Sequence, residues 1–359
     1  MLGRGQIQKM LQEMVAAGCQ YAVVETSSEG ILQYRHIGLN YDVAVFTNLG
    51  TEHSERHGGV ENLRRDKGKL FRELSRSKRK VIGGKAVPKV AVVNLDDAAA
   101  AYYLSFPADK KYGFTFNSQL KSVNSVDQTI IGRIKQTDNN GSDFFANDYE
   151  YRLPIVGDFN VANALAALAV ADAFQIDQKT AARGLNSVTV VPGRMEFIEA
   201  GQSFRVVVDF AHEPMSYEAL FRTLRSLVGP SHKVIGVIGS DGGGRDIKKR
   251  GIMGKIAGKL CDIVVVSDVN CYDDDPKEIA EMLAQGAREA GKKDTVDLFV
   301  IVDRRRGIRH AFALAGVGDV VAITAKGTEP YIAVADGKRI PWDDRAVARE
   351  LLKELTERR

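Results

Sequence analysis

Short apolar runs that alternate with helical patterns constrain the fold of this 359-residue chain more than any other feature. Three such runs lie early in the chain, at 21–24, 42–46 and 90–94. Because they are too short for helices and are bounded by polar residues, they predict buried strands. Buried strands separated by helical patterns indicate a mostly parallel sheet with crossover helices, and hence an α/β fold.

The rest of the first half is more varied. Apolar residues between Ile7 and Val15 share one helical face, and Gly18 suits the position just after a helix. Residues 129–153 alternate and contain the turn sequence DNNG, which predicts an antiparallel hairpin or meander. An Ala-rich helix is predicted at 159–174.

The pattern restarts after Pro192-Gly193, which predicts a domain boundary near residue 190 and two domains, 1–190 and 191–359. Strands are predicted at 204–210, 233–239, 263–267, 298–302 and 320–324. Helices are predicted at 216–227, 251–260, 276–290, 305–315 and 345–356. This order indicates a second, Rossmann-like α/β domain, in which ligands bind at the carboxyl ends of the strands.

Composition excludes several classes of protein. The formal charge of +4, from 50 basic and 46 acidic residues, is too balanced to indicate nucleic-acid binding. The basic stretch 64–80 is interpreted as a solvated helix face. The three cysteines have no CxxC spacing, which argues against disulfides and zinc and favours a reducing cytoplasm. No apolar run reaches the roughly 18 residues of a membrane span, and the first residues lack the core of a signal peptide.

Polar residues follow several predicted strands. The segment 25–28, ETSS, suits a metal ion and a polar ligand, although its hydroxyls equally suit a helix N-cap. His53 follows the second strand beside an acid, where a lone His is more often simply exposed. The glycine-rich loop 239–246 could hold an anion with its N–H groups, and 326–329 places a cation and an anion together or forms a turn. The phosphate-binding motif GxxxxGK[ST] occurs nowhere in the 359 residues.

Taken in order, these segments resemble the Mur ligase family, particularly the members that add the third residue of the muramyl stem peptide. The resemblance covers essentially the whole chain. Its motifs are ETSSEG, VAVFTNLGTEHSERHG, GDFNVAN, PGRME, VDFAHEP, GGGRDIKKRGIMGKIA, KGTE and IPWDDRAVARE.

The resemblance implies an ATP- and magnesium-dependent ligase that joins an amino acid to UDP-MurNAc-L-Ala-D-Glu through an acyl phosphate. Magnesium would be held by Glu25, His53 and a carbamylated Lys67. The muramyl-peptide contacts would be Ser27, Gln33 and Arg35, and the incoming amino acid would meet Arg250 and Glu329. The nucleotide contacts would be Asn160, Asn163, Arg194 and Asp209. The implied ATP cleft lies between the two domains, with Glu25, His53 and Lys67 converging in it.

The chain departs from the family in two respects. The resemblance places the P-loop and a UDP-binding domain before residue 1, so we expect this chain alone to be inactive. A gene fragment, a late start codon or a non-catalytic nucleotide- or muropeptide-binding protein would each account for the departure, and the retained motifs favour a fragment. In place of the D-N-P-R motif of diaminopimelate-adding members, residues 267–276 read SDVNCYDDDP.

The acidic character of 267–276 favours a diamino acid, diaminopimelate or lysine, as the residue that is added. A folylpolyglutamate-type or cyanophycin-type ligase on the same scaffold is the other alternative. Gln33 and Arg35, which match muramyl-peptide contacts, argue against it.

Overall fold

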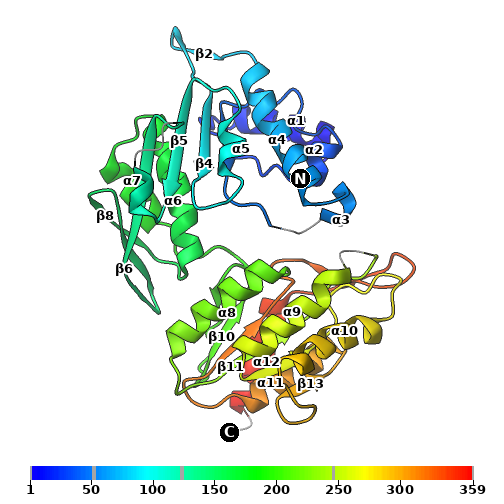
Figure 1. The fold of residues 1–359 in the computed structure, drawn as a ribbon. Helices are drawn as coiled ribbons and strands as arrows, with labels where there is room; N and C mark the ends of the chain where they lie inside the picture. Colours follow the sequence, from blue (N-terminus) through cyan, green and yellow to red (C-terminus); the bar gives the residue numbers. More distant parts are fainter. Residues whose placement is uncertain (1, 51–53, 122–124, 245–246, 358–359) are drawn as a thin grey trace. The chain divides into compact units, whose positions relative to one another are not determined.

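The computed structural model describes residues 2–50, 54–121, 125–244 and 247–357 (Figure 1). The chain forms two compact units. Unit 1 comprises 1–136, 143–152 and 160–186, and unit 2 comprises 137–142, 153–159 and 187–359. No helix in the described part of the chain is both long and apolar enough to cross a membrane.

Unit 1 is built on a six-stranded sheet with the order β1-β4-β5-β6-β7-β8. Its strands are β1 (Val43–Phe46), β4 (Val90–Asn94), β5 (Lys110–Thr115), β6 (Gln128–Asp138), β7 (Gly141–Ala146) and β8 (Tyr149–Leu153). The pairs β1–β4, β4–β5 and β5–β6 are parallel, with Val43 opposite Val90. Only two residues separate β6 from β7 and β7 from β8, a length that joins antiparallel neighbours. The parallel sheet and the antiparallel meander are therefore confirmed. A separate hairpin pairs β2 (Val81–Ile82) with β3 (Lys85–Ala86).

Most helices of unit 1 bury part of their surface, whereas α7 has no buried residue. They are α1 (Arg4–Ala16), α2 (Ser28–Leu32), α3 (Ser54–His57), α4 (Val60–Arg76), α5 (Ala100–Leu104), α6 (Asp158–Ala173) and α7 (Gln178–Asn186), with a 3₁₀ turn at Ser118–Lys121. In α4, Leu63, Phe71 and Leu74 are buried, which confirms that the basic stretch forms one side of an amphipathic helix. Phe46 of β1 stacks on Tyr103 of α5 with ring centroids 3.9 Å apart.

The predicted strand at 21–24 is wrong, because these residues have no regular secondary structure. Tyr21 and Val23 are 60% and 98% exposed. A strand forms only where a neighbour accepts and donates its backbone hydrogen bonds. In the described ranges, β1 is the edge strand of the sheet, β4 is its one partner, and no strand pairs with 21–24.

Unit 2 contains a second six-stranded sheet, with the order β13-β12-β11-β14-β10-β9. Its strands are β9 (Glu196–Phe197), β10 (Arg205–Val208), β11 (Val234–Ile238), β12 (Ile263–Val266), β13 (Leu298–Val300) and β14 (Val320–Ile323). All neighbours are parallel except β9 and β10. The five predicted strands and the Rossmann-like organisation are confirmed. A short hairpin, β15 (Tyr331–Ala333) with β16 (Arg339–Pro341), lies outside this sheet.

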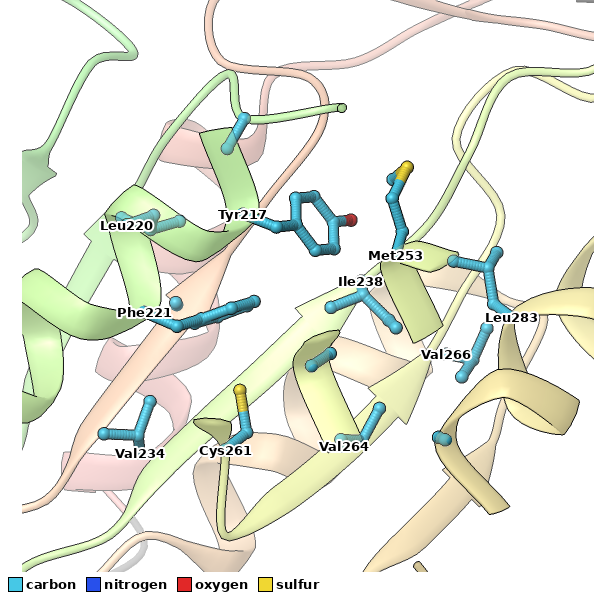
Figure 2. Packing of buried hydrophobic residues seen from close by; sticks show 14 of the residues in the cluster. Tyr217, Leu220, Phe221, Val234, Ile238, Met253, Cys261, Val264, Val266 and Leu283 are labelled. Atoms are coloured by element: carbon cyan, nitrogen blue, oxygen red, sulfur yellow. The ribbon is translucent and has the colours of Figure 1, made fainter. Parts of the chain in front are cut away.

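Helices cover both faces of this sheet, because its strands are apolar on both sides. They are α8 (Pro214–Val228), α9 (Ile247–Leu260), α10 (Pro276–Glu289), α11 (Arg304–Leu314) and α12 (Asp344–Glu357). One core joins α8, α9 and α10 to the sheet, with Tyr217, Phe221 and Met253 packed over β11 and β12 (Figure 2). The other core joins α11 and α12 to the opposite face, where alternate strand residues such as Val237 and Val265 point. The strand ends are thus fixed by a three-layer core.

Helices α9 and α10 approach each other backbone to backbone. A β-carbon added at Gly254 would lie 1.9 Å from the carbonyl oxygen of Leu283, and one at Gly286 would lie 2.1 Å from that of Gly251. Contacts this short cannot be relieved by rotating a side chain. The two glycines therefore set the separation of α9 and α10.

Candidate functional site

Candidate site residues of unit 2 follow parallel strands, and Asp209 among them was predicted as a nucleotide contact. Asp209 comes directly after β10, Asp241 lies in the loop after β11, Asn270 follows β12, and Lys326 follows β14. Because β10, β11, β12 and β14 are parallel neighbours, their carboxyl ends share one edge of the sheet. This edge is the place where such folds bind ligands.

The turn 191–194 carries Arg194. The N–H of Arg194 donates to the carbonyl of Val191 at 3.0 Å, with Pro192 and Gly193 between them. Gly193 has φ +67°, which matches the second central position of a type II turn. The exposed guanidinium of Arg194 lies 4.7 Å from the centroid of the Phe210 ring, which is a cation–π contact.

Asp209 fixes the backbone on both sides of this site. Its carboxylate accepts hydrogen bonds from the N–H groups of Met195 and Ala211, both at 2.7 Å. Burial raises the pKa of Asp209 above its usual value, although the two N–H bonds and Arg194 oppose the shift. The residue predicted to contact the nucleotide thus also holds the turn of Arg194.

A charged network surrounds Asn270 at the same edge of unit 2. The buried Lys326 donates to Asn270 Oδ1 at 3.0 Å and to Glu329 Oε2 at 2.8 Å. Asn270 Nδ2 donates to Asp241 Oδ1 at 2.8 Å and to Glu329 Oε2 at 3.0 Å. The Glu329 side chain is 36% exposed, so a ligand can reach it. Only Glu329 of these four was predicted to bind substrate.

Arg250, predicted to grip the incoming amino acid, is 2% exposed. Its guanidinium donates to the carbonyl of Asp241 at 3.0 Å and lies 3.6 Å from the carboxylate of Asp274. These contacts hold the glycine-rich loop 239–244 against α9 and the acidic loop after β12. Its observed contacts are therefore with the loops of the site.

Asp268 and Cys271 were not predicted as site residues. Burial raises the pKa of Asp268, against the opposing effects of the Val269 N–H, Arg304 and Lys326. Burial also raises the pKa of the Cys271 thiol, with Asp268 acting in the same direction. The signal that could have found Asp268 was its position immediately after a buried strand.

The predicted muramyl-peptide residues of unit 1 cluster around α2. Ser27 is the N-cap of α2, with its hydroxyl oxygen accepting from the N–H of Gly30 at 3.2 Å. Arg35 donates to the side-chain oxygen of exposed Gln33. The structure brings Gln33 and Arg35 together and gives Ser27 the capping role that the sequence had left open.

The predicted metal residues remain a prediction. Glu25 is exposed in the segment before α2, and Lys67 is half-buried on α4. His53 lies outside the described residues. On α6, Asn160 is buried and Asn163 is exposed one helical turn later, so both lie on neighbouring positions of one face.

A polar pocket of about 390 Å³ lies along the outer side of α4, lined by His57, Asn62, Arg65, Asp66, Lys69 and Arg72. His57 Nδ1 is 2.6 Å from one oxygen of Asp66, and Lys69 pairs with the other at 2.6 Å. Burial opposes the charge of Asp66, but bonds from Lys69 and His57 outweigh it and lower the pKa.

Two family models match the chain. The Mur ligase middle domain matches residues 4–171, and the Mur ligase, glutamate ligase domain matches residues 193–327. The chain is 39% identical over 360 residues to a UDP-N-acetylmuramyl-tripeptide synthetase of Roseiflexus sp., covering 98% of this chain and 68% of the relative. It is 36% identical over 352 residues to a UDP-N-acetylmuramoyl-L-alanyl-D-glutamate–2,6-diaminopimelate ligase of Geobacillus kaustophilus. This match covers 97% of this chain and 68% of the relative.

Solved structures agree on the fold. A UDP-N-acetylmuramoyl-L-alanyl-D-glutamate–2,6-diaminopimelate ligase aligns over 99% of this chain and 69% of its own, with a TM-score of 0.56 and 28% identity. A folylpolyglutamate synthase of Mycobacterium tuberculosis shares the fold at a TM-score of 0.57 and 21% identity. The chain spans about two thirds of the length of the curated relatives it matches. On the sequence relationship to these enzymes, this chain belongs to the Mur ligase family.

Proposed function

We propose that this chain forms the middle and C-terminal parts of an ATP-dependent ligase that adds an amino acid to UDP-MurNAc-L-Ala-D-Glu. The observation that carries the proposal is the set of charged residues at the carboxyl ends of β10, β11, β12 and β14. The names of the relatives supply the substrate. The direct test, on the chain with a P-loop segment supplied upstream, is formation of the muramyl tripeptide from the dipeptide, ATP and a labelled amino acid, followed by mass spectrometry.

The proposed reaction begins with a carboxylate, which is a poor electrophile at neutral pH. The terminal phosphoryl group of ATP passes to a carboxylate oxygen of the muramyl dipeptide and releases ADP. The free amino group then attacks the acyl carbon, an amide bond forms, and phosphate leaves. Two anions must approach each other in the first step, so the site needs cations placed in advance.

Residues of unit 2 are suited to parts of this task. Arg194 presents an exposed guanidinium on a fixed turn and would neutralise a phosphate oxygen. The carboxylate of Glu329, held by buried Lys326, would bind the ammonium group of an amino acid. In unit 1, Asn160 and Asn163 would contact the adenine, and Ser27, Gln33 and Arg35 the muramyl peptide.

The donor set proposed for magnesium has two hard oxygen donors, the Glu25 carboxylate and a carbamate on Lys67, and one borderline nitrogen donor, the His53 imidazole. Carbamylation fits Lys67 chemically because it converts a half-buried cation into an anion. Bound magnesium would neutralise charge on the phosphates during transfer. The part of Glu25 and carbamylated Lys67 themselves would be to supply negative charge.

We propose a diamino acid, diaminopimelate or lysine, as the added residue. Support comes from the loop that follows β12, where Asp268, Asp273, Asp274 and Asp275 lie within eight positions. Such a loop favours a substrate with an additional ammonium group. In a competition among diaminopimelate, lysine, glutamate and alanine, the two diamino acids should be incorporated first. Preferential incorporation of glutamate or alanine would show that the proposal is wrong.

We further propose that the 359-residue chain by itself does not turn over ATP. Its sequence contains no GxxxxGK[ST] segment to position and neutralise the terminal phosphates. Phosphate release should be undetectable with the purified chain, ATP, magnesium, muramyl dipeptide and diamino acids, and should appear when a P-loop segment is supplied upstream. Turnover by the chain alone that disappears in Glu25→Ala would contradict this. Continued inactivity with a P-loop would favour a non-catalytic binding protein.

A further inference from the structure

We propose that Glu196 is a positioning residue which, with Arg345 and Arg349 of α12, holds the turn that carries Arg194. The nucleotide-binding role of Arg194 rests on the proposed function. The contacts that join Glu196 to α12 and to the turn do not depend on it. Glu196 occupies the first position of β9 and pairs with Val208 at the end of β10. It therefore lies between the turn and the carboxyl end of the sheet.

The backbone around Arg194 needs such support, because the residue that follows it is strained. Gly193 has φ +67°, and Met195, which is not a glycine, has φ +47°. A non-glycine residue in this region is strained and persists only where its surroundings fix it. Met195 is 4% exposed, and its N–H donates to Asp209. The strain is therefore maintained by contacts outside the turn.

Glu196 provides the second of these contacts. Its Oε2 atom accepts a hydrogen bond from the N–H of Gly193 at 2.8 Å. The residue is only 9% exposed, so its charge requires partners. Arg345 lies 3.6 Å from Oε2, and Arg349 lies 3.3 Å from Oε1. Two cations of α12 thus hold a carboxylate that in turn fixes the N–H group preceding Arg194.

Arg345 is itself held in place. Asp343 accepts from Arg345 Nε at 3.0 Å and from Nη2 at 2.6 Å, and these bonds raise the pKa of the guanidinium. Arg349 has a side chain that is 48% exposed. Arg349 can therefore be changed with little loss of packing, and it is the better position for an experiment.

The turn also contacts the loop that carries Lys326. A β-carbon at Gly193 would lie 2.6 Å from the carbonyl carbon of Gly327. Residues that hold the turn therefore also hold the backbone beside the Lys326–Glu329 pair. The proposal assigns α12 a part in shaping both the proposed nucleotide contact and the proposed amino-acid contact.

The test compares Glu196→Gln, Arg349→Ala and Arg349→Lys with the wild-type chain by amide hydrogen exchange across residues 191–197. Both Glu196→Gln and Arg349→Ala should accelerate exchange of the Gly193 and Met195 amides about tenfold, as local opening becomes easier. Arg349→Lys should restore protection because it keeps the cation. The matched control is Arg309→Ala, which removes an ion pair between α11 and Glu354 of α12.

Unchanged protection in Arg349→Ala, with the overall unfolding midpoint also unchanged, would overturn the proposal. This variant decides the matter even if Glu196→Gln fails to fold. Titration with a fluorescent ADP analogue separates the proposal from the proposed function. Faster exchange together with weaker ADP binding supports both. Faster exchange with unaltered ADP binding supports the positioning role of Glu196 and contradicts the nucleotide role of Arg194.

Discussion

The predicted site residues of the two units differ in how they are held. In unit 2, Asp209, Arg250 and Glu329 belong to hydrogen-bonded networks at the ends of parallel strands. In unit 1, Glu25 and Gln33 are exposed on segments that flank a five-residue helix. Both sets were identified by the same kind of motif, so motif strength does not account for the difference.

The difference shows that a sheet fixes the positions of the loops that follow its hydrogen-bonded strands. Segments without a paired strand lack this support. Each loop of the unit 2 site starts from a strand with neighbours on both sides or with a covered edge. The segment before α2 has no strand partner in the described part of the chain, and Val23 is almost fully exposed. Preorganisation, which lowers the cost of binding charged groups, is therefore a property of unit 2 as observed.

The largest expected effect would break the comparison by showing that a residue of unit 1, outside the networks of unit 2, carries the chemistry. In a ligase-active form of the protein, Lys67→Ala should reduce the turnover rate by at least about 10²–10³-fold, as for loss of other electrostatic groups. Short carboxylic acids should partly restore activity by replacing the carbamate. Lys135→Ala, which removes an exposed lysine paired with Glu150, is the control. Full activity of Lys67→Ala without added acid would exclude the role.

A second experiment sharpens the comparison by measuring how much the stability of unit 2 depends on a buried ion pair. Asp344 is fully buried and accepts from Arg304 Nε at 2.8 Å and Nη2 at 2.7 Å. Asp344→Ala leaves the buried guanidinium unpaired and should lower the free energy of unfolding by about 3–5 kcal/mol. Urea unfolding followed by fluorescence of Trp342, the single tryptophan, reports on this unit.

The matched control for Asp344→Ala lies on the same helix. Glu354 pairs with Arg305 and Arg309 but its side chain is 38% exposed. Glu354→Ala should change the free energy of unfolding far less than Asp344→Ala does, because exposed ion pairs contribute little to stability. Equal effects of the two substitutions would mean that burial does not distinguish these networks.

The smallest expected effect concerns pH. Since the pKa of Asp209 is raised in the folded state, the folded protein binds the proton more tightly than the unfolded chain. The resulting stability is present at low pH and is lost as pH rises from the usual aspartate value through the raised pKa, with a slope of at most about 1.4 kcal/mol per pH unit. Asp209→Asn should remove this slope, whereas Asp336→Asn, at an exposed position, should leave it unchanged. An identical slope in Asp209→Asn would rule out Asp209 as its source.

Much of the fold was predictable because local patterns and tertiary pairing agree. The run at 90–94 became β4 with the predicted bounds, and 42–46 became β1 shortened by one residue. The run at 21–24 shows the limit, because hydrophobicity reports a tendency to be buried but not the presence of a partner strand. Short elements such as α5 and β9 were missed because they have too few residues for a periodic pattern.

The sequence indicated which loops could form the candidate site, but it did not indicate which hydrogen bonds and ion pairs join their residues. The rule that ligands bind after parallel strands drew attention to the loops that contain Asp209 and Glu329. The bond of Glu196 to Arg349 joins residues 153 positions apart, and no local pattern encodes such a pair. Likewise, Lys326 was noted as a cation in a turn, but its complete burial depends on the tertiary packing around it.

The close approach of α9 and α10 has a consequence for mutational tolerance. Gly251 and Gly254 lie within one turn of the same helix, yet a β-carbon at Gly251 would meet only one atom, 4.0 Å away. In a library that randomises both positions, Gly251 should accept small side chains while Gly254 stays glycine. Gly258 should be intermediate, because its nearest obstacle is the β-carbon of Ala290 at 2.8 Å, with the Ala287 backbone at 3.0 Å. A single carbonyl group of α10, that of Leu283, would thus decide which residues position 254 accepts.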